Sequence, residues 1–172
     1  KAGKVLFDNK CSKCHGAHNR ATDGYPIYHQ PKFIKSSIVK TDTDRLNDYF
    51  EYKTLVESSS LADILPMNQR KEVGYVAPNL WGIWARFPYL HNGSVPDVRS
   101  LLDSESRPDI WKRIPNEYNH ENVGWSYEQL DIKVDKQTYD SSIPGYGNSG
   151  HTFGDHLNTN ERNALLEYLK TI

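Results

Sequence analysis

The sequence "CSKCH" at residues 11–15 is the feature that most constrains what this chain folds into. It holds both cysteines of the 172-residue chain, Cys11 and Cys14, with His15 directly after the second. The Cys-x-x-Cys-His order is the attachment motif for haem c, in which both sulfurs form thioethers to the porphyrin and the adjacent histidine ligates iron. We therefore predict one covalent haem c, bound through Cys11, Cys14 and His15.

Two other uses of the paired cysteines are weaker. A disulfide across so short a loop removes little chain entropy and therefore stabilises little. A structural zinc site needs four ligands, with a second cysteine or histidine pair at similar spacing, and the remaining histidines are scattered along the chain. Haem attachment is the interpretation that accounts for all three residues of the motif.

The composition fits one domain that is completed by a flat apolar group. The chain has 21 basic and 22 acidic residues, a net charge of −1, so nothing indicates a nucleic-acid partner. Only 37% of residues are hydrophobic, which is low for a large core, whereas the 11 tyrosines and 4 tryptophans suit packing around a macrocycle. We expect a single mono-haem domain over residues 1–172, belonging to a longer exported protein.

The expected location follows from the haem motif. No apolar run is long enough to cross a membrane, and the start "KAGKVLF" resembles a mature or excised N-terminus. Because bacteria attach haem c outside the cytoplasm, we expect a periplasmic or extracellular protein.

Helical patterns occur at both ends of the chain and in its middle. We expect a short helix with Val5, Leu6 and Phe7 just before the haem motif, and helices over residues 42–59 and 94–104. The clearest helix begins after Asn158, with Glu161 placed to complete a capping box. Its apolar face is formed by Leu165, Tyr168, Leu169 and Ile172. The predicted fold class is therefore mainly α, a cytochrome c fold with long irregular insertions that have room for a small β-hairpin.

The segment from Arg107 to Gly150 is rich in proline, glycine, asparagine and aspartate, and its structure is the hardest to predict. The run "QLDIKVDK" is a candidate for paired strands. A partner-binding surface or a calcium site are alternatives for this segment, but the spacing of Asp131, Asp135 and Asp140 matches no known calcium loop.

The sixth iron ligand, opposite His15, decides between electron transfer and ligand chemistry. The candidates are Met67, His91, His151, His156, His18, His29 and His120. His151 lies in a glycine-flanked loop just before the last helix, where the backbone can approach a flat group. We interpret His18 and His29 as surface or propionate-side residues, and His120 and His156 as solvent-facing.

Other residues near "ARFPYLHNGS" are candidates for packing around haem. His91 is either an axial ligand or a partner of a haem propionate, with Arg86 offering a bidentate fork to the same carboxylate or remaining a surface charge. Tyr89, Trp81 and Trp84 would shield the ring, although each is also an ordinary core aromatic.

Three stretches resemble a known family: "APNLWGIWARFPYLHNGSVPDVRSLL", "ESRPDIW" and "YDSSIPGYGNSGHTFGDHLNTNERNALLEYLKTI". They are similar to the C-terminal haem domain of the bacterial di-haem cytochrome c peroxidase superfamily, and most closely to the branch that includes rubber oxygenases. The resemblance covers the haem motif and most of residues 77–172. It implies a mainly helical cytochrome c fold with a long inserted loop.

The resemblance also bears on the ligands. It implies that His91 lies near the haem without ligating it, as in the peroxidases, whose own ligand follows the next helix. Here that place holds only Ser104 and Glu105. The rubber-oxygenase branch uses histidine on both faces of its electron-transfer haem. Together with the loop position, this makes His151 the predicted ligand, ahead of His91 and Met67. The superfamily carries two haem motifs, whereas this chain has one, so it is either a module of a longer protein or a single-haem relative.

Three functions follow from these alternatives. A bis-histidine haem without a vacant site predicts single-electron transfer to or from a redox partner protein or a fused catalytic or second haem domain. An open or exchangeable distal site predicts a peroxidase or oxygenase, with Glu105, His91 or His120 as acid–base residue. A sensor whose distal ligand exchanges is the third alternative. Electron transfer is the prediction, so we expect no catalytic residues of the chain's own.

Overall fold

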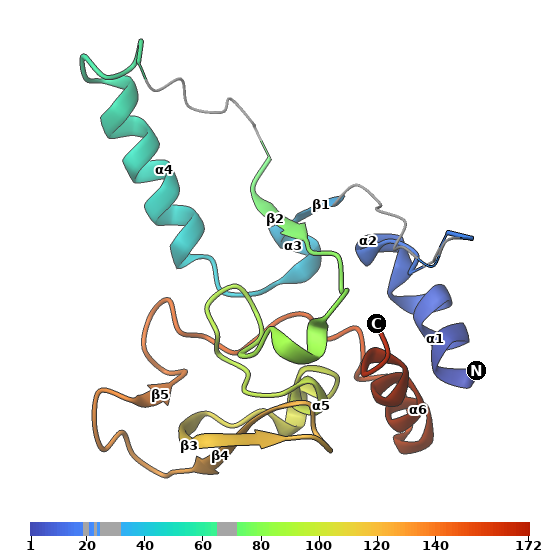
Figure 1. Cartoon of the computed structure of the whole chain (residues 1–172). Coiled ribbons are helices and arrows are strands. Elements are labelled where there is room, and N and C mark those ends of the chain that lie inside the picture. The colour runs from blue at the N-terminus through green and yellow to red at the C-terminus, as the bar shows by residue number, and fades with distance from the viewer. Residues whose placement is uncertain (19–20, 23, 25–31, 65–71) are drawn as a thin grey trace.

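The computed structural model describes residues 1–18, 21–22, 24, 32–64 and 72–172 (Figure 1). Its α-helices are α1 Ala2–Lys10, α2 Ser12–His15, α3 Ser36–Val39, α4 Asp44–Glu57, α5 Val98–Leu101 and α6 Thr159–Leu169. Two short 3-10 helices are η1 Ile83–Ala85 and η2 Ser104–Ser106. The strands are β1 Lys32–Lys35, β2 Gly74–Ala77, β3 Ile110–Asn119, β4 Gly124–Gln129 and β5 Thr138–Asp140.

The first and last helices pack against each other and bring the two ends of the chain together (Figure 1). Phe7 of α1 is fully buried, as are Leu165 and Leu166 of α6. The ring of Phe7 also contacts that of Tyr168, with 5.4 Å between centroids. The same core continues under the 89–102 segment through side chains that include Val95 and Val98.

The prediction of a mainly α fold is wrong. Among the described residues, helices account for 34% and strands for 19%, and the strands form two antiparallel sheets. One sheet pairs β1 with β2, and the other has the order β4-β3-β5. The inserted segments therefore satisfy their backbone groups by cross-strand pairing rather than as irregular loops.

The three-stranded sheet lies between Arg107 and Gly150, the segment whose structure was hardest to predict from the sequence. The run "QLDIKVDK" is not a strand pair, because β4 ends at Gln129 and residues 131–137 are exposed bends before β5. The strand that was missed is β3, which contains Pro115 within a register shift between Arg113 and Tyr118. Proline cannot donate to a ladder and is confined to edges and bulges, so the sequence pattern argued against a strand there.

The predicted helices fare unevenly. Helix α1 and helix α6 are confirmed, and α6 carries the complete capping box of Asn158 and Glu161. Helix α5 is one turn long and is capped by Asp97. The wider helix expected over residues 94–104 is therefore wrong, because the chain turns into η2 after Leu102.

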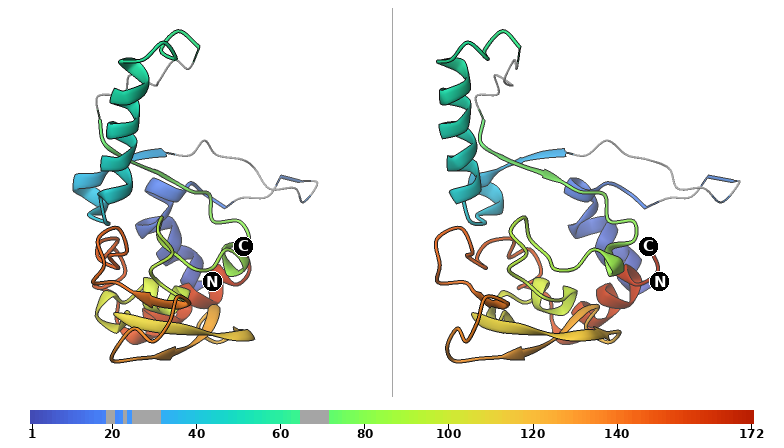
Figure 2. Two further views of the ribbon diagram at one scale, coloured as in Figure 1. Left: turned by 90° about the vertical axis from the view of Figure 1, so that its left-hand side faces the viewer. Right: turned by 60° about the vertical axis from the view of Figure 1, so that its left-hand side comes forward.

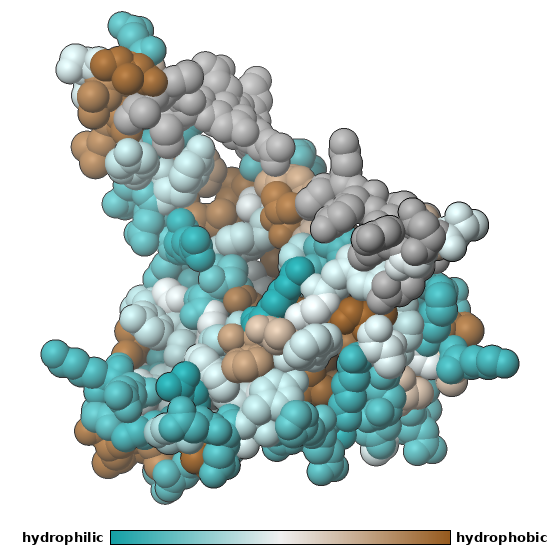
Figure 3. Space-filling view, in the orientation of Figure 1, coloured by the Kyte–Doolittle hydropathy of each residue, from teal (hydrophilic) through white to brown (hydrophobic). Residues whose placement is uncertain are grey.

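Helix α4 confirms the middle helix but not a fully buried stripe. In both turned views it projects away from the rest of the molecule (Figure 2). Val56 is its buried residue, whereas Tyr49 is 39% exposed and Leu55 is 68% exposed. Hydrophobic surface is visible around the free end of this helix in Figure 3. Among the described residues, no helix is both long and apolar enough to cross a membrane.

Candidate haem site

The attachment motif forms a short helical turn directly after α1. Cys11 follows the end of α1, and its carbonyl accepts hydrogen bonds from the backbone N–H groups of Cys14 and His15, at 3.1 and 3.0 Å. Both thiols are free and only half-buried. Burial, followed by the charge of Cys14, raises the pKa of the Cys11 thiol to about 11, so Cys11 keeps its proton at neutral pH. The turn thus presents two sulfurs and one imidazole within five residues.

The imidazole of His15 is held by a backbone carbonyl. Its Nδ1 lies 2.8 Å from the carbonyl oxygen of Pro78, which directly follows β2. A carbonyl only accepts, so Nδ1 carries the proton and the lone pair of Nε2 is left for a metal. Burial lowers the pKa of His15, although the Pro78 hydrogen bond acts to raise it, and this favours the neutral ring. The contact is of the kind that orients histidine ligands.

The loop before α6 places a second imidazole next to the first. Gly150 and His151 both have left-handed backbones, with φ of 78° and 46°. A side chain at Gly150 would meet the backbone of Lys40 at 2.3 Å, so only glycine allows this approach. The N–H of His151 donates to the carbonyl of Val39 at 2.7 Å. The loop is thereby fixed against α3.

The rings of His15 and His151 have their centroids 6.1 Å apart, with 60° between their planes. Metal–nitrogen bonds of about 2 Å place the centres of two imidazoles on one ion roughly 6 Å apart. The buried Nδ1 of His151 has no hydrogen-bond partner among the described residues, but neither ring nitrogen of His91 has one either, so this observation does not single out His151. The separation of the His15 and His151 rings fits one iron between them.

The surroundings of His151 determine its protonation state. Burial lowers its pKa to about 4, with further lowering by the charges of His15 and Arg107. The ring is therefore neutral at pH 7, and metals bind the neutral form of histidine. The ring of Phe153 meets His151 edge-on, with 5.1 Å between centroids, and restricts its orientation.

His91, the second ligand candidate, has a different environment. Its ring stacks on Tyr75 of β2, with centroids 4.3 Å apart, and neither ring nitrogen has a hydrogen-bond partner among the described residues. Its backbone carbonyl accepts from Arg45 at 3.0 Å. Burial lowers the pKa of His91, so this ring too is neutral at pH 7. The structure gives it no ring contact with His15, in contrast to His151.

The other predicted haem contacts have structural partners of their own. The Tyr89 hydroxyl is buried and lies 3.0 Å from the carbonyl of Ile83 and 3.1 Å from that of Val123. Arg86 is exposed and donates to the carbonyl of Asn79 at 2.6 Å. The ring of Trp81 contacts that of His18, whereas Trp84 is 47% exposed. Their contacts with haem stay predictions.

The remaining candidate ligands differ in how far their side chains are buried. His18 is only 6% exposed and packs against Phe7, so its interpretation as a surface residue is wrong. It is buried because it follows the attachment turn into the space beside α1. His120 and His156 are exposed, as predicted. Met67 and His29 lie outside the described residues.

The sequence analysis missed Arg107, a buried arginine that contacts the His151 loop. It is 8% exposed and donates to five backbone carbonyls, among them those of Gly150 at 2.7 Å and His151 at 3.1 Å. A hint was available in the sequence, because a glycine-rich loop near a core leaves carbonyls that need donors. Nothing local to "ESRPDIW" indicated that this arginine meets that loop.

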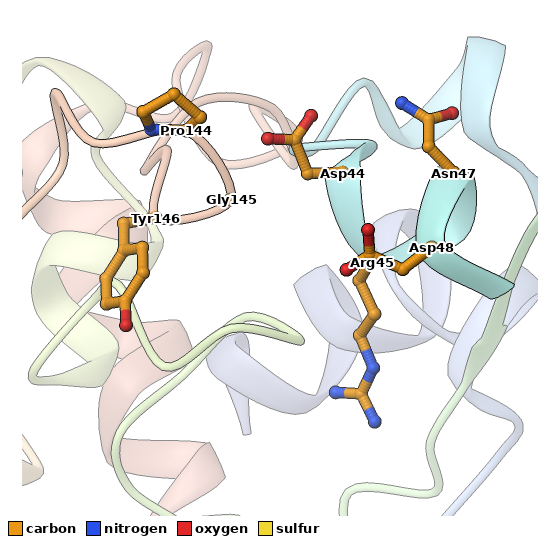
Figure 4. A pocket seen from close by; sticks show the side chains of 7 residues that line it. All are labelled: Asp44, Arg45, Asn47, Asp48, Pro144, Gly145 and Tyr146. Atoms are coloured by element: carbon orange, nitrogen blue, oxygen red, sulfur yellow. The ribbon is translucent and has the colours of Figure 1, made fainter. Parts of the chain in front are cut away.

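One surface pocket has no candidate iron ligand in its lining. It has a volume of about 450 Å³ and lies between the start of α4 and residues 144–146 (Figure 4). Its lining includes Asp44, Arg45 and Tyr146. Two of the three aspartates considered for calcium are engaged elsewhere: Asp135 with Lys112, and Asp140 with Ser142. The described residues contain no cluster of three or more metal-ligating side chains.

Parts of the chain are similar to known proteins. Residues 74–112 match the family described as "RoxA-like, cytochrome c-like". Two uncharacterised proteins of Sinorhizobium fredii (strain NBRC 101917 / NGR234) are similar: y4iJ is 36% identical over 110 residues, and y4iM is 29% identical over 182 residues. These alignments cover 58% and 87% of this chain, but only 18% and 40% of the respective relatives.

The attachment motif and the matched segment are similar to those of a c-type cytochrome domain. More particularly, residues 74–112 resemble the RoxA-like cytochrome c family, in agreement with the resemblance to the rubber-oxygenase branch. Such a domain implies haem c as the cofactor and haem-based electron transfer as its general role. The matched residues include Pro78, whose carbonyl accepts a hydrogen bond from His15. They also include Arg107, which contacts residues 148–151, the distal loop.

Proposed function

We propose that this domain carries single electrons through one six-coordinate haem c with histidine on both faces. Cys11 and Cys14 would hold the porphyrin through thioethers, and His15 and His151 would be the axial ligands. The observation that carries the proposal is the 6.1 Å separation of the two imidazoles, which leaves room for one iron between them. When bound, haem supplies one-electron ferric–ferrous chemistry.

The contacts of both histidines support a closed site. The Pro78 carbonyl fixes the His15 tautomer, and Val39 with Arg107 fixes the backbone of His151. Two rings that are already held near their ligating positions leave little reorganisation for oxidation and reduction. An imidazole on each face also excludes peroxide and oxygen from the iron, which favours a carrier over an oxygenase.

The electron partner is a further part of the proposal. We expect a redox protein or a catalytic or second haem domain of the same polypeptide, because the domain has one haem motif and covers under half of each relative. We also propose export to the periplasm or beyond, where bacterial haem c attachment takes place. Comparing the reduction kinetics of the domain alone with those of the parent protein would test a fused partner.

Optical spectra of histidine variants test the axial ligands. The purified domain should show low-spin bands in both oxidation states, and these bands should resist modest cyanide or carbon monoxide. His151→Ala should become high-spin and bind carbon monoxide, whereas the control His156→Ala, at an exposed position of the same loop, should not. An unchanged His151→Ala spectrum would exclude His151 as a ligand. A high-spin wild-type protein that turns over peroxide would support the enzyme alternative.

Covalent attachment is tested separately. Haem in the wild-type domain should stay with the polypeptide through acidified acetone, and mass spectrometry should show one haem per chain. Replacing Cys11 or Cys14 by alanine should leave a single thioether and shift the band of the pyridine haemochrome to longer wavelength. Extraction of haem from the wild-type protein would contradict the attachment.

A further inference from the structure

We propose that Arg107 is the positioning residue for His151: it holds the backbone of the distal loop so that the imidazole is already presented to the iron. This inference deepens the proposed function and rests on His151 being the distal ligand. It concerns a side chain with no predicted role and no contact with the attachment motif.

The hydrogen bonds of Arg107 form a complete set. A guanidinium has five N–H donors, and here each has a backbone carbonyl as acceptor. Two acceptors lie at the end of α5, Ser100 at 3.2 Å and Leu101 at 3.1 Å. Three lie in the distal loop: Asn148 at 2.6 Å, Gly150 at 2.7 Å and His151 at 3.1 Å. One side chain therefore joins the short helix to the ligand loop.

The loop needs such a donor because of its backbone conformation. Gly150 and His151 are both left-handed, an unfavourable state for a histidine, and their carbonyls point into the protein instead of toward water. On the opposite side, the N–H of His151 is bound by Val39. Arg107 and Val39 thus fix His151 through its carbonyl and its N–H respectively.

The position of Arg107 is not set by an ion pair. Asp103 and Asp155 influence the pKa of Arg107 through their charge, but neither forms a hydrogen bond with it. The hydrogen bonds of Asp103 and Asp155 go to Arg162 and to Ser104. All the hydrogen bonds of Arg107 therefore go to backbone carbonyls, so its role is to fix the backbone conformation of the loop. Lysine has three donors on a flexible stem and cannot reproduce this pattern.

Cyanide binding to the ferric protein tests the inference, because cyanide must wait for His151 to leave the iron. Arg107→Met should raise the binding rate constant by roughly tenfold or more, the factor expected for the loss of one or two net hydrogen bonds. It should also show a partial high-spin spectrum that added imidazole converts back to low-spin. Arg107→Lys should fall between Met and wild type, and it keeps the measurement possible if Arg107→Met does not fold.

Arg162→Met is the matched control. Arg162 is also part-buried, and its hydrogen bonds go to Asp103 and the carbonyl of Leu157 rather than to residues 148–151. It should lower the midpoint of thermal unfolding while leaving the cyanide rate within about twofold of wild type. An equal acceleration in Arg162→Met would overturn the inference, since general loosening would then explain the effect.

His151→Ala distinguishes failure of the ligand assignment from failure of the positioning role of Arg107. If this variant is high-spin and binds cyanide rapidly while both Arg107 variants behave as wild type, the positioning role is overturned and the ligand assignment stands. If His151→Ala leaves the spectrum and the rate unchanged, the ligand assignment itself fails, and the positioning role fails with it.

Discussion

Gly3 of α1 lies directly against the backbone of Ala164 in α6. A methyl group added at Gly3 would meet the Ala164 carbonyl oxygen at 1.9 Å, far inside van der Waals contact. The two helices therefore approach as closely as they do because this position has no side chain. Phe7, one turn further along α1, fills the same interface and is fully buried.

Gly3→Ala should therefore destabilise the domain in spite of the higher helix propensity of alanine. Forcing the helices apart costs about 1–3 kcal/mol by analogy with overpacked cores. Denaturant unfolding followed by circular dichroism would measure it. Val5→Ala, on the exposed side of the same helix, is the control and should change the free energy of unfolding little. Equal stability of Gly3→Ala and wild type would show that the helices are further apart.

Asp97 tests the cap of α5. Its Oδ1 accepts from the backbone N–H of Ser100 at 2.7 Å, whereas its Oδ2 is buried without a partner among the described residues. Asp97→Ala should lose about 1–2 kcal/mol because the cap is removed. Asp97→Asn keeps the acceptor and should stay within ~0.5 kcal/mol of wild type at neutral pH.

The pH dependence of these variants carries a definite sign. Burial raises the pKa of Asp97 above its usual 3.8, against the Ser100 hydrogen bonds that lower it. The folded state thus takes up the proton before the unfolded state does, so this carboxyl stabilises the fold increasingly as pH falls from neutral toward 3.8. The difference in unfolding free energy between wild type and Asp97→Asn should shift toward wild type over that range. A shift in the opposite direction would mean that the Asp97 charge is stabilised in the fold.

His91→Phe distinguishes the two leading ligand candidates. Phenylalanine preserves the stack on Tyr75, where the rings are 4.3 Å apart, but offers no lone pair. We expect the oxidised and reduced spectra to stay low-spin, because His151 and not His91 lies next to His15. Conversion to a high-spin spectrum would transfer the ligand assignment to His91.

Tyr89→Phe measures a buried hydroxyl in the core. The hydroxyl lies within hydrogen-bond distance of the Ile83 and Val123 carbonyls, and each of those carbonyls also accepts from a backbone N–H. The expected loss is therefore only about 1 kcal/mol, without a change in the haem spectrum. Tyr52→Phe, at a 54% exposed position of α4, should be neutral and serves as the reference. A spectral change in Tyr89→Phe would place the hydroxyl at the haem instead.

The features that the sequence predicted well are those that depend on neighbours along the chain. The attachment motif spans five residues, and the capping box of Asn158 and Glu161 spans four, so both could be recognised locally. The glycine-flanked loop and the family resemblance together favour His151 over His91. The structure places the ring of His151 beside that of His15, and ligation by His151 stays a prediction.

The features that were missed depend on distant partners. The length of β3 is set by pairing with β4 and β5, and Pro115 in its irregular stretch hid the strand pattern. Arg107 is explained only by carbonyls more than forty residues away in the chain. His18 is buried by Phe7 and Trp81 rather than by any pattern of its own.

The small β1–β2 sheet has a consequence for the width of the metal site. At one end of its ladder Lys32 pairs with Ala77, next to the Pro78 carbonyl that anchors His15. At the other end β1 runs into α3, whose Val39 anchors His151. The paired strands thus connect the two residues that hold the imidazoles. A shift of the strand register by one residue, about 3.4 Å, would change the distance between the two imidazoles. The register of this small sheet would thus set the distance between the two proposed ligands, although none of its own residues is a candidate ligand.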